Sequence, residues 1–427
     1  MKRFCFSFIG LILAISFLFN LVGCTIEEAT DTQVQDLTAG VYQHLVEPLT
    51  REEMYPYHGA INRFAMELFQ ESNVANENSL ISPLSVLFAL AMTANGAGGE
   101  TLKQMESVLG MSIADLNKYL YSYMECLPEK QEYHRSEFLP ANSIWFDKEN
   151  GFIPKQEFLQ NNADYYGAEL YSIPFNEDSV EIINDWVKEN TKDTIPSMVD
   201  KLDENTVMIL LNALLFESQW KNTYNEESVK IGVFTKEDGT EQRAEFMYNM
   251  YDEGYYLEDD KATGFMKSFC DTSYKFIALL PKEGVSVSDY VDSLNGDSVE
   301  NLLDNGKWAE IDTAIPKFET EFSVELDEIL RKMGMVDAFE EGKADFSNMG
   351  SLKSATLSIG EITHKANIKV DEMGVVAGAA TQVSIIDVGG GPDEQRKVYL
   401  DRPFIYVLYD SINHIPLFIG TMMDIEQ

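Results

Sequence analysis

Cysteine and histidine, and the motifs built from them, are scarce in this 427-residue sequence. Of its four cysteines, Cys5 and Cys24 lie in an N-terminal apolar run, which leaves Cys126 and Cys270 for the rest of the chain. Two cysteines so far apart in a large domain are expected to stay free thiols, so a disulfide framework is not predicted. Neither Cys-x-x-Cys nor His-Glu-x-x-His occurs. The sequence therefore predicts no metal site and no cofactor.

Basic residues are also few, because 32 lysines and arginines stand against 71 aspartates and glutamates, a formal net charge of −39. A surface of that sign repels phosphate backbones and anionic polysaccharides, so nucleic acid is not expected as a partner and heparin is disfavoured. None of the five histidines lies near a Gly-x-Ser-x-Gly elbow or another hydrolase signature. A Ser/His/Asp triad needs no adjacent residues, so an enzyme with an unrecognised site stays open as an alternative without a motif behind it.

The sequence also has no stretch with the composition of a linker between domains. At about 150 residues per domain the length suggests two or three domains, but no Pro/Gly/Ser-rich stretch or composition break divides the chain after about Tyr57. Alternating stretches typical of strands, at 206–216 and 274–280, lie between helical patterns at 61–69 and 180–191. One large domain of mixed α+β class over residues 56–427 is therefore expected.

The N-terminus is typical of an export signal. Lys2 and Arg3 precede an apolar run over residues 4–21, which ends in Leu-Val-Gly-Cys at Cys24. This pattern predicts a bacterial lipoprotein signal peptide at residues 1–23, with Cys24 carrying the lipid. The alternative is an ordinary signal peptide with a chance cysteine.

The acidic, patternless residues 24–55 are then expected to be a tether. The protein is therefore expected to be exported and lipid-anchored at the bacterial cell surface, or released from it. It would contact the membrane only through the lipid on Cys24.

Near the C-terminus the chain has a segment suited to insertion into a sheet. No charged residue occurs from Met373 to Ile386, and Ala377, Gly378 and Ala379 have almost no side-chain volume. As a strand, this segment could be buried on both faces.

This segment resembles the hinge of the serpin family of protease inhibitors. Further matches to serpin motifs follow in the family's order, at 78–85, 89–92, 95–101, 212–216, Trp220, 315–318, 330–339, 344–347, 401–404 and 416–420. The resemblance implies the serpin fold, with three β-sheets, about nine helices and an exposed reactive-centre loop. It also implies a suicide inhibitor and not an enzyme. A serine protease attacks the loop, and the loop inserts into the main sheet before the acyl-enzyme is hydrolysed.

The resemblance assigns site residues one by one. The hinge comprises Glu372, Gly374, Val375, Val376, Ala377, Gly378, Ala379, Ala380 and Thr381. A shutter group that holds two strands of the main sheet comprises Ser82, Ser85, Asn212 and His364. A breach group at the upper end of that sheet comprises Trp220, Lys317 and Glu372. The chain departs from the usual pattern at Val375 and Val376, where most inhibitory relatives have Thr or Ser and then Glu; both valines suit a strand.

The usual spacing from the hinge glycine places the scissile bond at Val388-Gly389. A small aliphatic residue before the scissile bond suits elastase-like or subtilisin-like extracellular serine proteases. The inhibitor is expected to be a monomer that forms a covalent complex with such a protease. Cleavage after Ile385 or Ile386 is the near alternative, because three glycines loosen the register. Arg396 would suit a trypsin-like enzyme but lies too close to the next strand to be reached. A non-inhibitory serpin that binds a ligand or partner, and an inhibitor of a cysteine protease, also stay open at this point.

Overall fold

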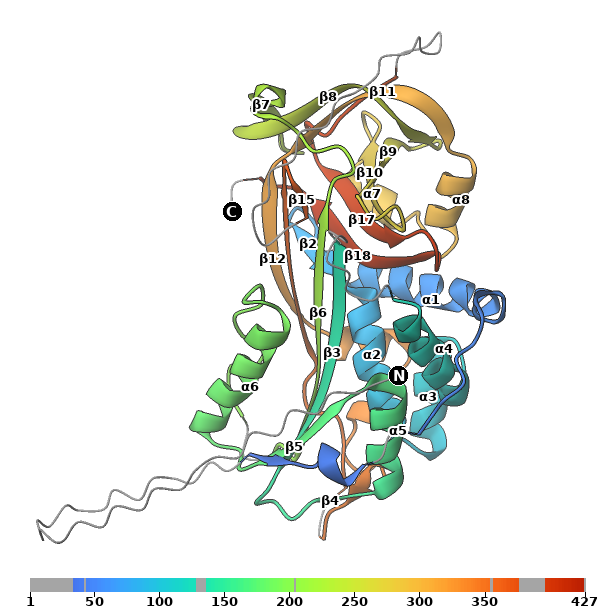
Figure 1. Cartoon of the computed structure of the whole chain (residues 1–427), viewed down its shortest axis with the longest axis vertical. Helices are drawn as coiled ribbons and strands as arrows, with labels where there is room; N and C mark the ends of the chain where they lie inside the picture. Colours follow the sequence, from blue (N-terminus) through green and yellow to red (C-terminus); the bar gives the residue numbers. More distant parts are fainter. Residues whose placement is uncertain are drawn as a thin grey trace, which may run out of the picture.

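The computed structural model describes residues 34–41, 44–127, 136–202, 205–353, 356–375 and 396–425 (Figure 1). Within these ranges the chain forms nine α-helices and three hydrogen-bonded sheets of seven, nine and two strands. The predicted mixed α+β class with three sheets and about nine helices is confirmed.

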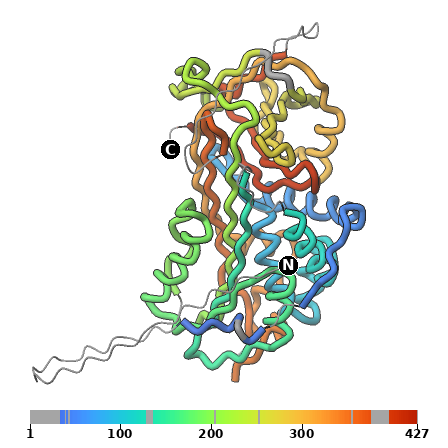
Figure 2. Tube along the Cα trace, in the orientation of Figure 1, coloured from blue at the N-terminus to red at the C-terminus, as the bar shows by residue number. Residues whose placement is uncertain are grey.

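The seven-stranded sheet is the long central layer of the molecule. Its order is β1 (Gln35–Asp36), β5 (Glu169–Ile173), β3 (Ser136–Asp147), β6 (Met208–Gln219), β15 (Gly374–Val375), β14 (Thr363–Asp371) and β12 (Phe318–Glu325). Figure 2 shows how β6 in green lies beside the orange and red strands of the C-terminal third. Strands far apart in sequence therefore meet at the centre of this sheet.

The nine-stranded sheet lies in the upper part of the molecule in the view of Figure 1. Its order is β16 (Arg396–Tyr399), β11 (Lys307–Pro316), β8 (Glu241–Glu258), β9 (Ala262–Ser268), β10 (Tyr274–Pro281), β17 (Phe404–Asp410), β18 (Ile415–Met422) and β2 (Ser79–Ile81), with β7 (Val229–Thr235) paired to β8. β13 (Gly350–Ser351) and β4 (Ile153–Pro154) form the small sheet.

The helices lie mainly on one face of the central sheet. They are α1 (Arg51–Ser72), α2 (Pro83–Ala94), α3 (Gly99–Leu109), α4 (Ile113–Glu125), α5 (Gln156–Tyr166), α6 (Glu177–Asn190), α7 (Val287–Val291), α8 (Ser298–Asp304) and α9 (Asp327–Met333). Figure 1 shows α6 alone on the opposite face from α2 and α5. Apolar side chains of α6, including Trp186 and Val187, pack there against Trp145 and Leu211 of the sheet.

Helix α2 is the centre of the core because it packs on both large sheets, against β6 and β18. Its sequence is apolar on every side, as a fully buried helix requires. Ser82 caps its N-terminus by accepting a hydrogen bond from the Ser85 amide, and Pro83 takes the first helical position, where no amide donor is needed. The helix start is thereby fixed beneath the middle of the central sheet.

Part of the predicted tether contacts the domain. β1 pairs with β5 through Gln35 opposite Ser172, and the His44 ring lies 2.9 Å from the Asp164 carboxylate. Helix α1 begins at Arg51, inside the range predicted for the tether. No helix within the described residues is long and apolar enough to cross a membrane.

Candidate functional site

The centre of the seven-stranded sheet is interrupted. Strands β6 and β14 are not paired with each other in the described part of the chain, and the two residues of β15 lie between them. Val375 of β15 pairs with Ser218 of β6 and with Val370 of β14, antiparallel to both. It is buried, at 4% exposure. The first part of the predicted hinge therefore occupies the upper end of a position for one additional strand.

Gly374 is required by the backbone at this point. Its φ of +149° lies in a region that other residues rarely adopt. A Cβ placed on it would also lie 2.1 Å from the Ser218 carbonyl oxygen. The turn and the close approach to β6 both depend on the missing side chain, which agrees with the backbone role predicted for this glycine.

The turn that leads into β15 is held by two side chains. The Asp371 carboxylate accepts hydrogen bonds from the amides of Met373 and Gly374, at 2.8 and 3.3 Å. The Trp220 indole donates to the Asp371 carbonyl oxygen at 2.8 Å, while its ring stacks on Phe269 with centroids 4.8 Å apart. Sequence reasoning assigned Trp220 to this region but missed Asp371, although an aspartate before a glycine turn is a common turn signal.

Lys317 and Glu372 form the predicted ion pair at the upper end of the sheet. The Lys317 Nζ lies 2.9 Å from the Glu372 carboxylate and 3.2 Å from that of Glu245. The Glu372 carboxylate raises the pKa of Lys317, and Lys317 in turn lowers the pKa of Glu372. Because Lys317, Glu372 and Glu245 are all partly exposed, the pairs are expected to steady the turn only modestly.

The four residues predicted as a shutter group lie together below β15. The Ser82 amide donates to the His364 Nε2 at 3.0 Å, and the Ser85 hydroxyl donates to the Asn212 carbonyl oxygen at 3.5 Å. Asn212 also donates its side-chain amide to Asn142 of β3 at 2.8 Å. The N-terminal turn of α2 thus connects β14 on one side with β6 and β3 on the other. Asn142 was not predicted, since only the β3–β6 register brings it opposite Asn212.

His364 is a neutral acceptor in this arrangement. Its ring is buried at 5% exposure, and its Nε2 accepts a hydrogen bond from a backbone amide. Burial lowers the pKa of His364 from 6.5 to about 4. Protonation would charge a buried group and remove the acceptor that joins β14 to α2.

Acidification is therefore expected to destabilise the protein through His364. In the unfolded chain this histidine binds a proton near pH 6.5, whereas in the folded chain it does so only near pH 4. The contribution of neutral His364 to the free energy of unfolding is therefore fully present above pH 6.5. It is lost as the pH falls from 6.5 to about 4, by about 3 kcal/mol for a pKa shift of this size. Urea midpoints at pH 7.5 and 5 would show about 2 kcal/mol of this loss, and His364→Asn should remove that part. Burial also lowers the pKa of His58 to about 4, so the loss that remains in the variant comes from His58. An unchanged pH slope in that variant would contradict the assignment.

Several predicted residues lie outside the described residues. They are Cys24, Val376, Ala377, Gly378, Ala379, Ala380, Thr381, Ile385, Ile386, Val388 and Gly389. Arg396, by contrast, is described and is the first residue of β16, where it pairs with Ile311. Its guanidinium lies over the Tyr256 ring, 4.7 Å from the centroid. An arginine held in a strand in this way is a poor site for cleavage.

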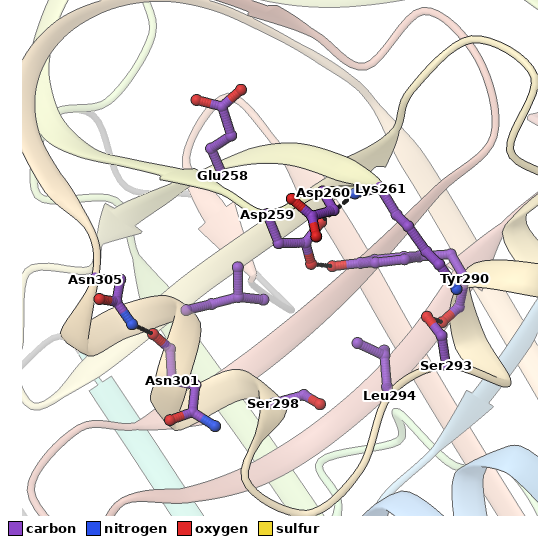
Figure 3. Close-up of a pocket in the computed structure, with 11 residues that line it drawn as sticks. Glu258, Asp259, Asp260, Lys261, Tyr290, Ser293, Leu294, Ser298, Asn301 and Asn305 are labelled. Carbon is purple, nitrogen blue, oxygen red and sulfur yellow. Dashed lines mark hydrogen bonds between the residues drawn. The ribbon is translucent and has the colours of Figure 1, made fainter.

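Two surface pockets flank α8. The first, of about 460 Å³, is acidic, with Glu258, Asp259 and Asp260 on one side (Figure 3). The Asp259 carboxylate is engaged, because the Tyr290 hydroxyl donates to it at 2.7 Å. Among the described residues, no cluster of histidine, cysteine or acidic side chains has the arrangement of a metal site. Cys126 and Cys270 are free thiols.

The second pocket, of about 510 Å³, has a mixed lining. Lys221 and Lys275 line it together with Glu300 and Asp304 of α8. Tyr409 is buried against it, and its hydroxyl has no hydrogen-bond partner in the described part of the chain. Ser411 and His414 also line the pocket, but the Ser411 hydroxyl donates to the Ser273 carbonyl oxygen at 2.8 Å.

Comparisons with known proteins agree with this geometry. The family model for serpins, described as serine protease inhibitors, matches residues 59–425, so the chain belongs to the serpin family. The crystal structure of a thermophilic serpin, tengpin, in its native state is 41% identical, with a TM-score of 0.85 over 92% of this chain and 100% of that one. The latent state of tengpin fits less well, at a TM-score of 0.76.

Curated relatives include named inhibitors. Serine protease inhibitor 88Ea of Drosophila melanogaster is 30% identical over 410 residues, covering 89% of this chain and 93% of the relative. Leukocyte elastase inhibitor of Homo sapiens is 28% identical over 388 residues, covering 84% and 97%. Members of the family are typically inhibitors of serine proteases and not enzymes.

Proposed function

We propose that this serpin is a surface-anchored suicide inhibitor of extracellular serine proteases with elastase-like or subtilisin-like specificity. The observation that carries the proposal is the position of β15. Two hinge residues already pair with β6 and β14, while those strands are not paired with each other further along, within the described residues. Among the described residues, β6 and β14 each therefore have an edge to which an inserted strand could hydrogen-bond.

The β15 register supports insertion of the hinge. Extended along the same antiparallel register, it brings Ala377, Ala379 and Thr381 onto the core face. Thr381 would then lie between Asn212 and His364, in the shutter group. Small side chains suit this face, because the sheet lies directly on buried α2 and protein interiors are close-packed.

The proposed chemistry is an interrupted acyl transfer. The protease serine oxygen attacks the carbonyl carbon of Val388, an ester forms, and the peptide bond to Gly389 breaks. The Gly389 nitrogen takes a proton and leaves as a new N-terminus. Insertion of the freed strand then competes with water, which would otherwise hydrolyse the ester. The new ladder bonds and the burial of the strand supply the driving force.

The target class is supported by residue size. A valine at the expected cleavage position suits a protease pocket for small aliphatic side chains. One of the relatives is named for its inhibition of leukocyte elastase. The lipid on Cys24 would hold the inhibitor at the cell surface, and the mass of the mature N-terminal peptide tests that part of the proposal.

Incubation with an elastase and with a subtilisin is expected to give a covalent complex. The chain without residues 1–24 should yield a band at the summed mass on denaturing gels, and mass spectrometry should find a released peptide beginning at Gly389. The cleaved chain should also unfold at a higher temperature, since insertion relieves a metastable state. A released peptide beginning at Ile386 or at Asp387 would instead move the scissile bond to the near alternative.

Clean cleavage without a complex, across several protease classes, would overturn the proposal. The second candidate function is then ligand binding by a non-inhibitory serpin. The second pocket beside α8 favours this function. Tyr409 lines that pocket, and its hydroxyl has no hydrogen-bond partner among the described residues. A complex with a cysteine protease alone would keep the mechanism and change the target.

A further inference from the structure

Two carboxylates face each other on neighbouring strands of the central sheet. Glu137 of β3 and Glu217 of β6 are register partners, and their side chains are only 18% and 14% exposed. Like charges directly opposite destabilise a strand pair. The Nζ of Lys192 contacts both, donating to the Glu217 carboxylate at 2.7 Å and to that of Glu137. Burial of Lys192 opposes its charge, but the two carboxylates outweigh this effect and raise the pKa of Lys192.

The backbone that presents Lys192 is strained. Helix α6 ends at Asn190, and Lys192 and Asp193 then have φ angles of +48° and +62°. Consecutive left-handed residues other than glycine are unfavourable and persist only where the surroundings hold them. Here Thr191 holds them, because its hydroxyl donates to the Val187 carbonyl and accepts from the Ile195 amide. In this conformation the Lys192 ammonium reaches Glu137 of β3 and Glu217 of β6.

The segment after Lys192 crosses to β14. The Thr194 carbonyl oxygen accepts from the Asn367 side chain of β14 at 3.4 Å. On β14, Asn367 lies three residues before Val370, which pairs with Val375. On β6, Glu217 is the residue before Ser218, the other partner of Val375, and lies just beyond the end of β15. Residues 192–194, which we call the strap, therefore bridge β6 and β14 directly beyond the end of β15.

The two ends of the strap are held unequally. On the β6 side, Lys192 is fixed by two carboxylates, and α6 packs onto β3 and β6 through Trp145, Leu211 and Ala213. On the β14 side there is the Asn367 contact at 3.4 Å, and a little further along Lys365, whose side chain is 18% exposed, pairs with the exposed Asp200 at 3.2 Å. Within the strap, Lys192 makes the ion pairs with the sheet, whereas the chain beyond the strap is held by buried Ile195 and by the Met198 and Val199 amides, which donate to Asn184 of α6.

We propose that Lys192 is a positioning residue for strand uptake, which fastens the strap across the entrance to the space between β6 and β14. A strand that extends β15 must pass its α6-facing side chains under the strap, so the strap has to lift. Release of Lys192 from Glu137 and Glu217 then limits the rate of uptake. This inference rests on the proposed insertion mechanism, but its test needs no protease.

Lys192→Met in the full chain is expected to speed the uptake of a synthetic peptide with the sequence of residues 374–387, followed by native mass spectrometry. The increase should be about threefold, the size expected for a partly exposed ion-pair group. Lys188→Met is the matched control, because it removes the same charge from α6, while Lys188 pairs with Asp185 of the same helix, at 3.1 Å. Lys192→Arg keeps both contacts and should behave as the unaltered chain.

Two further measurements keep the test decisive. Hydrogen exchange at residues 191–200 should rise in Lys192→Met and not in Lys188→Met. In a Glu137→Gln, Glu217→Gln background, Lys192→Met should have no further effect on either measurement. Should Lys192→Met fold poorly, Glu217→Gln alone tests the same fastening.

Equal uptake and equal exchange in Lys192→Met and Lys188→Met would overturn the role of the strap, even if proteases are trapped. Persistence of the Lys192→Met effect in the double-Gln background would do the same. No protease trapping by the unaltered chain, together with faster peptide uptake in Lys192→Met, would overturn the proposed function and leave the role of the strap supported.

Discussion

Ala379→Arg is expected to turn the proposed inhibitor into a substrate. By the register of β15, position 379 enters the sheet between Leu214 of β6 and Ala366 of β14, both of which are buried. A guanidinium there would be buried without a partner, at a cost of several kcal/mol, so insertion stops while cleavage continues. The fraction of protease trapped on denaturing gels should fall at least tenfold, since 1.4 kcal/mol corresponds to a factor of about ten.

Gln395→Arg is the matched control for this substitution. It adds the same charged side chain to the same loop, but on the far side of the expected Val388-Gly389 bond. Position 395 lies in the C-terminal piece, which stays in the nine-stranded sheet through β16, β17 and β18 and so does not enter the central sheet. Trapping should therefore stay close to that of the unaltered chain. If Ala379→Arg trapped protease as well as Gln395→Arg, insertion by this register would be wrong.

Gly374→Ala is expected to have the second largest effect. The added Cβ would meet the Ser218 carbonyl at 2.1 Å, and the φ of +149° disfavours any residue but glycine. The turn would have to move, so β15 should separate from β6 and β14. Hydrogen exchange at Gln219 and Val375 should rise, and the fraction of protease trapped should fall, because the first paired residues of the inserting strand are lost.

Gly360→Ala distinguishes this local clash from a general effect of losing a glycine. A Cβ at Gly360 would have no atom within 4 Å, and its φ is not positive. The control should leave both exchange and trapping unchanged. Equal behaviour of the two variants would show that β15 plays no part in insertion.

The proposed strap would account for one departure from the family pattern. Continued by one residue, the β15 register brings position 376 beside Glu217 and Lys369, on the face that α6 covers. Glu217 already shares Lys192 with Glu137. The glutamate that most inhibitory relatives have at this position would add a third carboxylate there, whereas Val376 adds none. A valine is thus compatible with uptake under the strap, and its β-branched side chain suits a strand.

The sequence predicted the fold because its motifs resemble those of the serpin family in the same order, and the resemblance also named most of the residues at the central site. Gly374 is recognisable from its place before a run of small residues, and the structure shows why a side chain is excluded there. Trp220, Lys317 and Glu372 lie in motifs whose order along the chain identifies the family, and the structure brings the three together at the turn.

The remaining contacts could not be predicted, because they join residues far apart in the chain. Asn142 meets Asn212 only through the pairing of β3 with β6, and a shift of one residue would turn it to the other face. Lys192 reaches Glu137 and Glu217 because Lys192 and Asp193, after α6, adopt left-handed backbone angles. The residue types lysine and aspartate do not predict such angles.

By itself, then, the sequence determined the family, the acidic composition and the small uncharged hinge, since composition and short motifs decide these. Only the tertiary structure decided that β15 pairs on both sides, that His364 is a buried neutral acceptor, and that a strap fastened by Lys192 crosses the next position of the sheet. Each of these depends on strand register and burial, which arise when distant segments pack together.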